Sequence, residues 1–77
     1  MEYKYVNRGK CNTCGQICWI DRNLVAIDCG CYSMHLSYNG LENINVIDIT
    51  DEEFKAAIRL EINIPYDTPI TLIHTPI

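Results

Sequence analysis

The chain has 77 residues and a net charge of −4, from six basic and ten acidic side chains. A chain of this length suffices for one small domain, whose apolar core alone is marginal, so we expect a structural metal or disulfides to stabilise it. Its 48% hydrophobic content argues against an intrinsically disordered chain, and no apolar run approaches the roughly 20 residues that a membrane span needs.

The N-terminus lacks the pattern of a basic stretch followed by an apolar run. We therefore expect no signal peptide and a cytoplasmic location. In a reducing compartment, clustered cysteines serve as metal ligands or redox thiols more often than as disulfides. The odd number of cysteines, five, also leaves one over in any purely disulfide framework.

The first half of the chain predicts three short strands. Residues 3–6 alternate aromatic and polar side chains, which favours a strand, and residues 7–10 are typical of a turn. Residues 16–20 and 24–28 predict two further strands, joined by a short polar turn. These last two strands form a hairpin in this interpretation.

The second half predicts a strand, a helix and two more strands. Residues 44–49 are rich in β-branched side chains and predict a strand. A helix is expected over 51–60, followed by an alternating strand over 60–64 and a turn over 65–69. Residues 70–75 predict the last strand, pairing back as a hairpin, with an edge that could support a homodimer.

The start of the expected helix carries a strong local signal. Thr50 and Glu53 have the spacing of a capping box, in which each side chain binds the backbone of the other residue. Ile49 and Phe54 flank it at the positions of a hydrophobic staple. The sequence therefore predicts that the helix begins directly after Thr50.

Two cysteine pairs flank the predicted hairpin. Cys11 and Cys14 form a C-x2-C pair followed by glycine, and Cys29 and Cys31 form a C-G-C pair. The hairpin brings both pairs to one end, where four thiolates can surround a zinc ion tetrahedrally. His35 offers an alternative fourth ligand in place of Cys31. The fifth cysteine is then Cys18, which we expect to act as a small core hydrophobe.

This layout resembles the zinc-ribbon family, in which two cysteine-bearing knuckles cap a β-hairpin. The resemblance extends over residues 11–31 and departs from the family pattern at the second pair, which is C-x-C in place of C-x2-C. It implies a structural Zn²⁺ and a binding surface. Because ribbons contact DNA, RNA and proteins alike, it implies no particular partner.

The elements together predict an α+β, metal-stabilised domain spanning residues 1–77. It would consist of a zinc-ribbon-like hairpin over 11–35, followed by a β-α-β-β part over 44–75. No nucleophile elbow or phosphate-binding glycine loop is present in the sequence. A zinc ion with four protein ligands leaves no position for water, so we do not expect an enzyme.

Charge divides unevenly between the two halves. Residues 1–35 carry four basic and three acidic side chains, for a net charge of +1, whereas residues 36–77 carry two and seven, for −5. An acidic half favours a protein partner with a basic patch, and we expect an interaction module that acts as a regulator or inhibitor. By analogy with the small acidic inhibitors that phages encode, the chain could be a phage-encoded inhibitor. Candidate partner contacts are Trp19, Tyr3, Tyr5 and Arg22, if the aromatic side chains are exposed.

Two alternatives remain open. The first is a nucleic-acid-binding ribbon that uses Arg8, Lys10, Arg22 and the nearby aromatic side chains. The acidic net charge disfavours it, and Arg8 and Lys10 could instead offset the negative charge of a thiolate-bound zinc. The second is a redox switch, in which oxidation of the thiols releases the metal.

Overall fold

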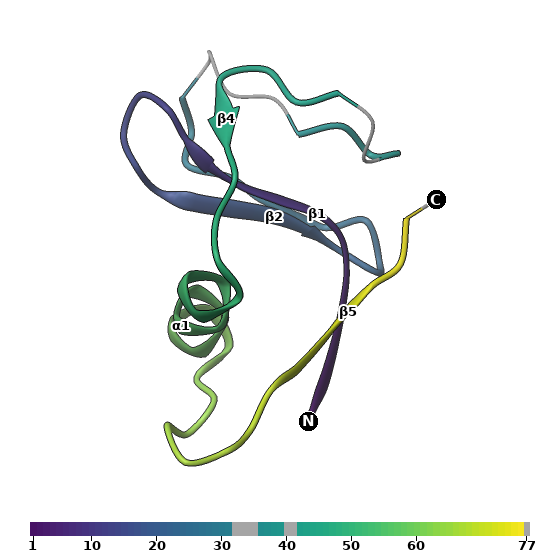
Figure 1. Cartoon of the computed structure of the whole chain (residues 1–77), viewed down its shortest axis with the longest axis vertical. Coiled ribbons are helices and arrows are strands. Elements are labelled where there is room, and N and C mark those ends of the chain that lie inside the picture. Colours follow the sequence, from purple (N-terminus) through teal and green to yellow (C-terminus); the bar gives the residue numbers. More distant parts are fainter. Residues whose placement is uncertain (32–35, 40–41, 77) are drawn as a thin grey trace.

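One long strand organises the fold. The computed structural model describes residues 1–31, 36–39 and 42–76. Their elements in chain order are β1 (Glu2–Cys11), β2 (Ile17–Asp21), β3 (Ala26–Ile27), β4 (Val46–Ile47), α1 (Asp51–Ile62) and β5 (Thr71–His74). Figure 1 shows β1 and β2 side by side, with α1 on one side of them and β4 on the other. The result is a small α+β domain with a curled, mostly antiparallel sheet.

Both edges of β1 are occupied. Strand β2 pairs antiparallel along one edge, and β3 extends the sheet beyond β2. On the other edge, β5 pairs parallel with the first residues of β1, and β4 pairs antiparallel with Lys10 and Cys11. The strand predicted over 70–75 is confirmed as β5. Its predicted hairpin pairing is wrong, because β5 pairs with the N-terminal strand β1 instead. Among the described residues β5 has no second strand partner, so the homodimer hypothesis stays untested.

A bulge in β1 reverses which residues face the helix. The pairing register with β2 shifts between Tyr5 and Asn7, so Tyr5 and Arg8 both point toward α1, where both contact Phe54. Asn7 and Cys11 face the opposite side. The predicted turn over 7–10 is wrong, since this segment continues β1 and pairs with β2.

Helix α1 begins as its capping signal predicts. The Thr50 hydroxyl accepts a hydrogen bond from the Glu53 backbone N–H at 3.1 Å, and the Glu53 carboxylate accepts one from the Thr50 N–H at 3.1 Å. The helix ends at Asn63, whose left-handed φ of 55° and N–H bond to the Arg59 carbonyl close the last turn. It is thus longer than expected, and the strand predicted over 60–64 is wrong.

The order after the hairpin is consequently β-α-β. The alternation over 60–64 does not mark a half-buried strand, because Leu60 lies in the last turn of α1 with 84% of its surface exposed. Within the described part of the chain, no helix is long and apolar enough to cross a membrane.

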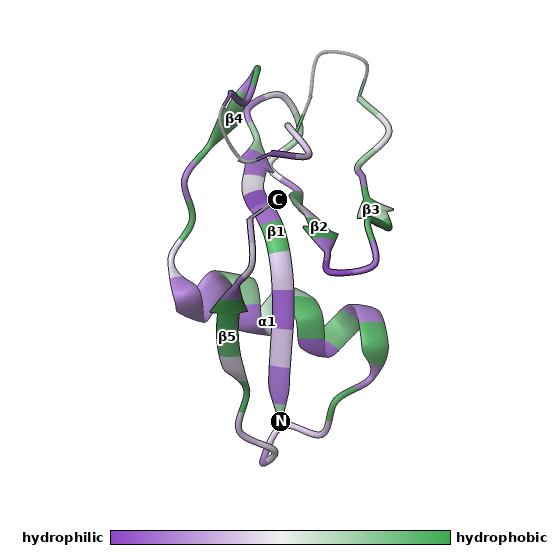
Figure 2. Ribbon diagram, turned by 90° about the vertical axis from the view of Figure 1, so that its right-hand side faces the viewer, coloured by the Kyte–Doolittle hydropathy of each residue, from purple (hydrophilic) through white to green (hydrophobic). Residues whose placement is uncertain are grey.

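The main core lies between α1 and the sheet. Phe54 is fully buried and makes edge-to-face contacts with Tyr3, Tyr5 and Trp19, at centroid distances of 6.2, 4.9 and 5.5 Å. We call this group the helix-side core; its buried members are Tyr5, Trp19, Ile49, Phe54, Ile58 and Ile70. Figure 2 shows that α1 runs across β1 and β5 and not along them.

The opposite side of β1 holds a second, smaller cluster. Cys11 and Cys18 are buried there and pack against two other cysteines, Leu36 and Val46. Asn7 ties the neighbouring loop to β1, because its Nδ2 donates to the Ser37 carbonyl at 2.8 Å and to the Asn43 side chain at 2.7 Å. The core on one side of the strand is therefore centred on aromatic rings, and the cluster on the other side is centred on cysteine sulfurs.

Candidate metal centre

The first cysteine pair sits on a tight turn between β1 and β2. Cys11 is the last residue of β1, and its N–H donates to the Gln16 carbonyl at 2.9 Å. Its carbonyl accepts the Gly15 N–H at 2.9 Å, which folds the chain back around the two sulfurs. Gly15 adopts a φ of 78°, a left-handed conformation that glycine reaches without a Cβ clash. The predicted knuckle at this position is confirmed as a turn.

The second pair follows β3. The N–H of Gly30 donates to the Asp28 carboxylate at 3.2 Å, and the N–H of Cys31 donates to the Cys29 sulfur at 3.4 Å. Gly30 has a φ of 83°, so it provides the same left-handed step that Gly15 provides in the first turn. A C-x-C pair with glycine in the middle can therefore turn both sulfurs to one side, despite being one residue shorter than the ribbon pattern.

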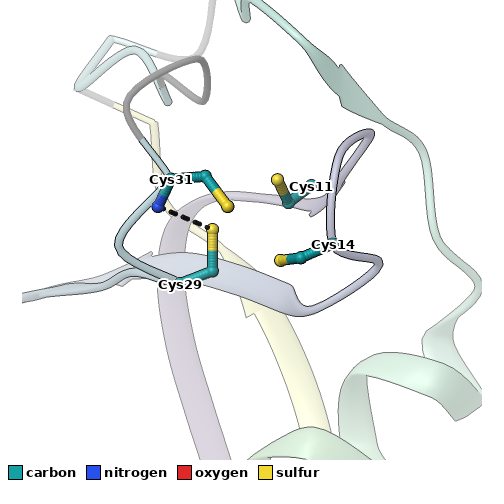
Figure 3. Close-up of side chains that lie close together, drawn as sticks. All are labelled: Cys11, Cys14, Cys29 and Cys31. Atoms are coloured by element: carbon teal, nitrogen blue, oxygen red, sulfur yellow. Dashed lines mark hydrogen bonds between the residues drawn. The ribbon is translucent and has the colours of Figure 1, made fainter.

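The two turns bring four sulfurs together. Figure 3 shows Cys11 and Cys14 facing Cys29 and Cys31, and their Sγ atoms all lie within 4.8 Å of one another. Zinc with Zn–S bonds of about 2.3 Å needs sulfurs about 3.8 Å apart, so a small inward movement completes a tetrahedron. This four-cysteine cluster fits a structural metal ion such as zinc in both donor type and spacing.

The four cysteines of the cluster differ in how deeply they are buried. Cys11 is 1% exposed, Cys29 and Cys31 are half-buried, and Cys14 is exposed. A bound ion would therefore lie at the end of the sheet, anchored by one sulfur in the protein interior. Four thiolates would fill all the positions of a tetrahedral ion, as in structural zinc sites.

Backbone amides prepare the cluster for a cation. The N–H groups of Cys14 and then Thr13 lower the pKa of the Cys11 thiol to about 6, in spite of its burial. Conversely, the neighbouring side chains of Cys29, Cys14 and Cys11 favour the protonated form of the Cys31 thiol and raise its pKa to about 12. The N–H of Cys31 lowers the pKa of Cys29, but burial and the side chains of Cys11 and Cys14 leave that pKa raised. A metal ion that binds here replaces the protons that these thiols share.

The fifth cysteine lies beside the cluster. Cys18 is fully buried, its Sγ donates to the Gln16 carbonyl at 3.6 Å, and burial raises its pKa to about 12. The expectation that Cys18 is a core residue is confirmed. Cys18, Asp28 and Cys29 also place ligand atoms within 4.8 Å of one another. Because this group shares Cys29 with the main cluster, it offers no independent second site. No sequence pattern predicted that Asp28 would lie beside the cysteines and accept the Gly30 N–H.

The aromatic residues expected to contact a partner belong mostly to the core. Trp19 is 2% exposed and Tyr5 is 9% exposed, because Phe54 packs on both rings. Tyr3 is half-buried, and its hydroxyl accepts the Trp19 Nε1–H at 2.7 Å. Trp19 and Tyr5 therefore lack the exposure on which their proposed contact role depended. Arg22 is exposed, and Tyr3 keeps part of its surface accessible.

The basic residues before the first cysteine pair point toward the helix. Arg8 forms an ion pair with Asp51 at 2.8 Å, and Lys10 forms one with Glu53 at 3.7 Å. The Arg8 guanidinium also lies over the rings of Tyr5 and Phe54, at 5.4 and 5.2 Å. Both basic side chains are therefore paired with acidic residues of α1, and not placed to offset the negative charge of a thiolate-bound zinc.

The chain has two histidines, His35 and His74. His35, the alternative fourth ligand, lies outside the described residues. The ring nitrogen of His74 lies 2.8 Å from the Val6 carbonyl, and its ring stacks on Tyr5 at 5.1 Å. His74 thus belongs to the joint between β5 and β1.

Comparison with protein-family models, curated proteins and solved structures finds no significant match to this chain. The interpretation of the site therefore depends on its own residues and geometry.

Proposed function

We propose that the chain binds one structural zinc ion through Cys11, Cys14, Cys29 and Cys31 and works as a non-enzymatic protein-interaction module. The observation that carries the metal assignment is the convergence of four Sγ atoms within 4.8 Å from two separate turns. Four thiolates select zinc or iron among common metals. The closed donor set supports a structural role for the ion.

Cobalt substitution tests the metal assignment. Protein reconstituted with Co²⁺ is expected to show the visible and charge-transfer absorption of a tetrahedral thiolate site, and one equivalent of Zn²⁺ is expected to abolish it. Cys14→Ser should weaken these bands, whereas Cys18→Ala should leave them unchanged. Equal spectra for wild type and Cys14→Ser would contradict the four-thiolate site.

The chain's charges support a protein partner over a nucleic acid. Arg8 and Lys10 are already paired with acidic side chains of α1, so the nucleic-acid hypothesis keeps only Arg22 of its three basic residues. The acidic surface favours a regulator or inhibitor that docks on a basic protein, in the cytoplasm. Fluorescence anisotropy with DNA and RNA oligonucleotides at low salt is expected to show no binding. Binding that falls steeply as salt rises would contradict the proposal.

A thiol switch is the second candidate, because the Cys18 sulfur lies within 4.8 Å of the Cys29 sulfur. Hydrogen peroxide would oxidise the Cys29 thiolate and the Cys18 thiol to a disulfide, with uptake of one proton and formation of two waters. Zinc would then lose one ligand and leave. Peroxide treatment, disulfide mapping and metal analysis test this. Zinc loss that is equal in wild type and Cys18→Ala would contradict a role for Cys18.

A further inference from the structure

A groove lies between α1 and strands β2 and β3. It has a volume of about 480 Å³. Its floor is formed by Ile17 and Trp19 of β2 and Ile27 of β3. One wall is a single face of α1, and one end is closed by the first cysteine turn; the residues involved are Glu53, Ala56, Ala57, Leu60 and Glu61 on the helix and Gly15 and Gln16 on the turn. The groove is thus separate from the four-cysteine cluster, but it is lined by residues of the turn that follows Cys14.

The groove is apolar at its floor and along most of its helix wall. Trp19 contributes only hydrocarbon surface, because its indole N–H is satisfied by the Tyr3 hydroxyl. Small side chains at Ala56 and Ala57 keep the groove open, and Leu60 stands at its rim with 84% of its surface exposed. An exposed leucine beside an open apolar groove is typical of an interaction surface.

The charges at the groove are all negative. Glu53 and Glu61 are its charged lining residues, and no lysine or arginine lines it among the described residues. Glu53 is engaged by Thr50 and Lys10, but none of the ion pairs in the described part of the chain involves Glu61. Burial raises the pKa of Tyr3, and the charges of Asp21 and Glu61 add to this effect. The groove therefore combines apolar surface with uncompensated negative charge.

We propose that this groove docks a segment of another protein that presents apolar side chains together with lysine or arginine. The inference rests on the proposed role as a protein-interaction module and names the surface and the chemistry of the partner. A second copy of this chain is a poorer occupant, because each copy carries a net charge of −4 and would bring its own acidic groups to the rim. A cationic, apolar segment matches both properties of the groove.

Metal binding and docking are linked through the first cysteine turn. Gly15 and Gln16 follow Cys14 directly and form one end of the groove. An ion that holds Cys14 would also hold this end in place. We therefore expect the zinc-bound protein to bind the partner segment more tightly than protein treated with chelator.

Two synthetic peptides test the proposal on the full chain. One is a short leucine–lysine peptide, and the other is a leucine–glutamate peptide of equal length and pattern. Fluorescence anisotropy of labelled peptide is expected to show binding of the first and none of the second. Glu61→Lys and Leu60→Lys are each expected to weaken binding by about tenfold or more.

Glu52→Lys is the matched control. It makes the same charge change on the same helix, but Glu52 does not line the groove. It is expected to change the affinity by less than about threefold. Equal loss in Glu52→Lys and Glu61→Lys would show a non-specific charge effect and overturn the proposal. A native mass spectrum with dimers that Leu60→Lys disperses would also overturn it, because the occupant would then be a second copy.

Metal content of the same samples separates the two proposals. If zinc-bound protein binds neither peptide, the proposed docking groove is overturned and the proposed metal site is not. Protein without zinc that binds the leucine–lysine peptide in a Glu61-dependent way supports the groove and contradicts the proposed metal.

Discussion

The two sides of β1 pack against different kinds of side chain. The helix-side core buries six residues around Phe54, whereas the cluster on the opposite side has Cys11 and Cys18 as its buried members, with half-buried neighbours. Apolar burial stabilises roughly in proportion to its area, so the helix side can largely hold itself together. The cluster around Cys11 and Cys18 is smaller. Under the proposed metal assignment, an ion would add stability at this second cluster and not at the helix-side core.

One strand serves both sides because of its bulge. Without the shift between Tyr5 and Asn7, strict alternation would place Cys11 on the same face as Tyr5. The extra residue turns Arg8 toward Phe54 and Cys11 toward Cys18. The bulge therefore separates the aromatic core from the thiol cluster within ten residues of one strand.

Metal removal should have the largest effect. Structural zinc contributes on the order of 10 kcal/mol in zinc-finger peptides, and the cluster that the ion would support is the smaller of the two buried clusters. Chelator is expected to lower the thermal midpoint strongly, with restoration by added Zn²⁺. Circular dichroism melting measures this. An unchanged midpoint would mean that both sides of β1 are held by packing alone.

Phe54→Ala should be the most damaging single change on the helix side. Its ring contacts three aromatic residues and is fully buried, so truncation should cost about 3–5 kcal/mol. Urea unfolding of zinc-saturated protein measures the loss, with Phe54→Leu as the milder control. A loss below about 1 kcal/mol would contradict the central place of this ring.

Gly9→Ala tests how β4 is held beside the thiols. A Cβ at Gly9 would collide with a methyl group of Val46, which packs against Cys11 and Cys18. Overpacking of this kind should cost about 1–3 kcal/mol. The double variant Gly9→Ala/Val46→Ala should lose less than the two single losses combined, because the methyl group is gone. Full additivity in urea unfolding would argue against this contact.

The capping box should produce a small pH effect. Hydrogen bonds from Thr50, and then the charge of Lys10, lower the pKa of Glu53 in the folded state. Its contribution to stability is therefore complete above the ordinary glutamate pKa and is lost as pH falls through the lowered value. Glu53→Gln keeps the capping geometry without the charge. The difference in thermal midpoint between wild type and Glu53→Gln should shrink over that pH range; a constant difference would contradict this.

The sequence alone was a good guide where structure depends on near neighbours. The cysteine spacing anticipated the cluster, and Thr50 with Glu53 marked the first turn of α1. Both signals act within a few residues or across one hairpin. The glycines after Cys14 and between Cys29 and Cys31 have the left-handed conformations that such turns use.

Features that depend on distant partners were missed. The parallel pairing of β5 with β1 joins residues about 70 positions apart, and no local pattern encodes it. The alternation over 60–64 looks like a strand, but the helix hydrogen bonding continues to Asn63. The burial of Trp19 and Tyr5 follows from Phe54, which only the fold brings to them.

Native mass spectrometry of protein purified without added metal tests the central claim most directly. Comparison of the native and denatured masses measures what the folded chain retains. The four-cysteine cluster predicts a difference of one zinc ion per chain, lost in Cys11→Ser. Equal native and denatured masses, with five thiols free to alkylation, would contradict the metal centre.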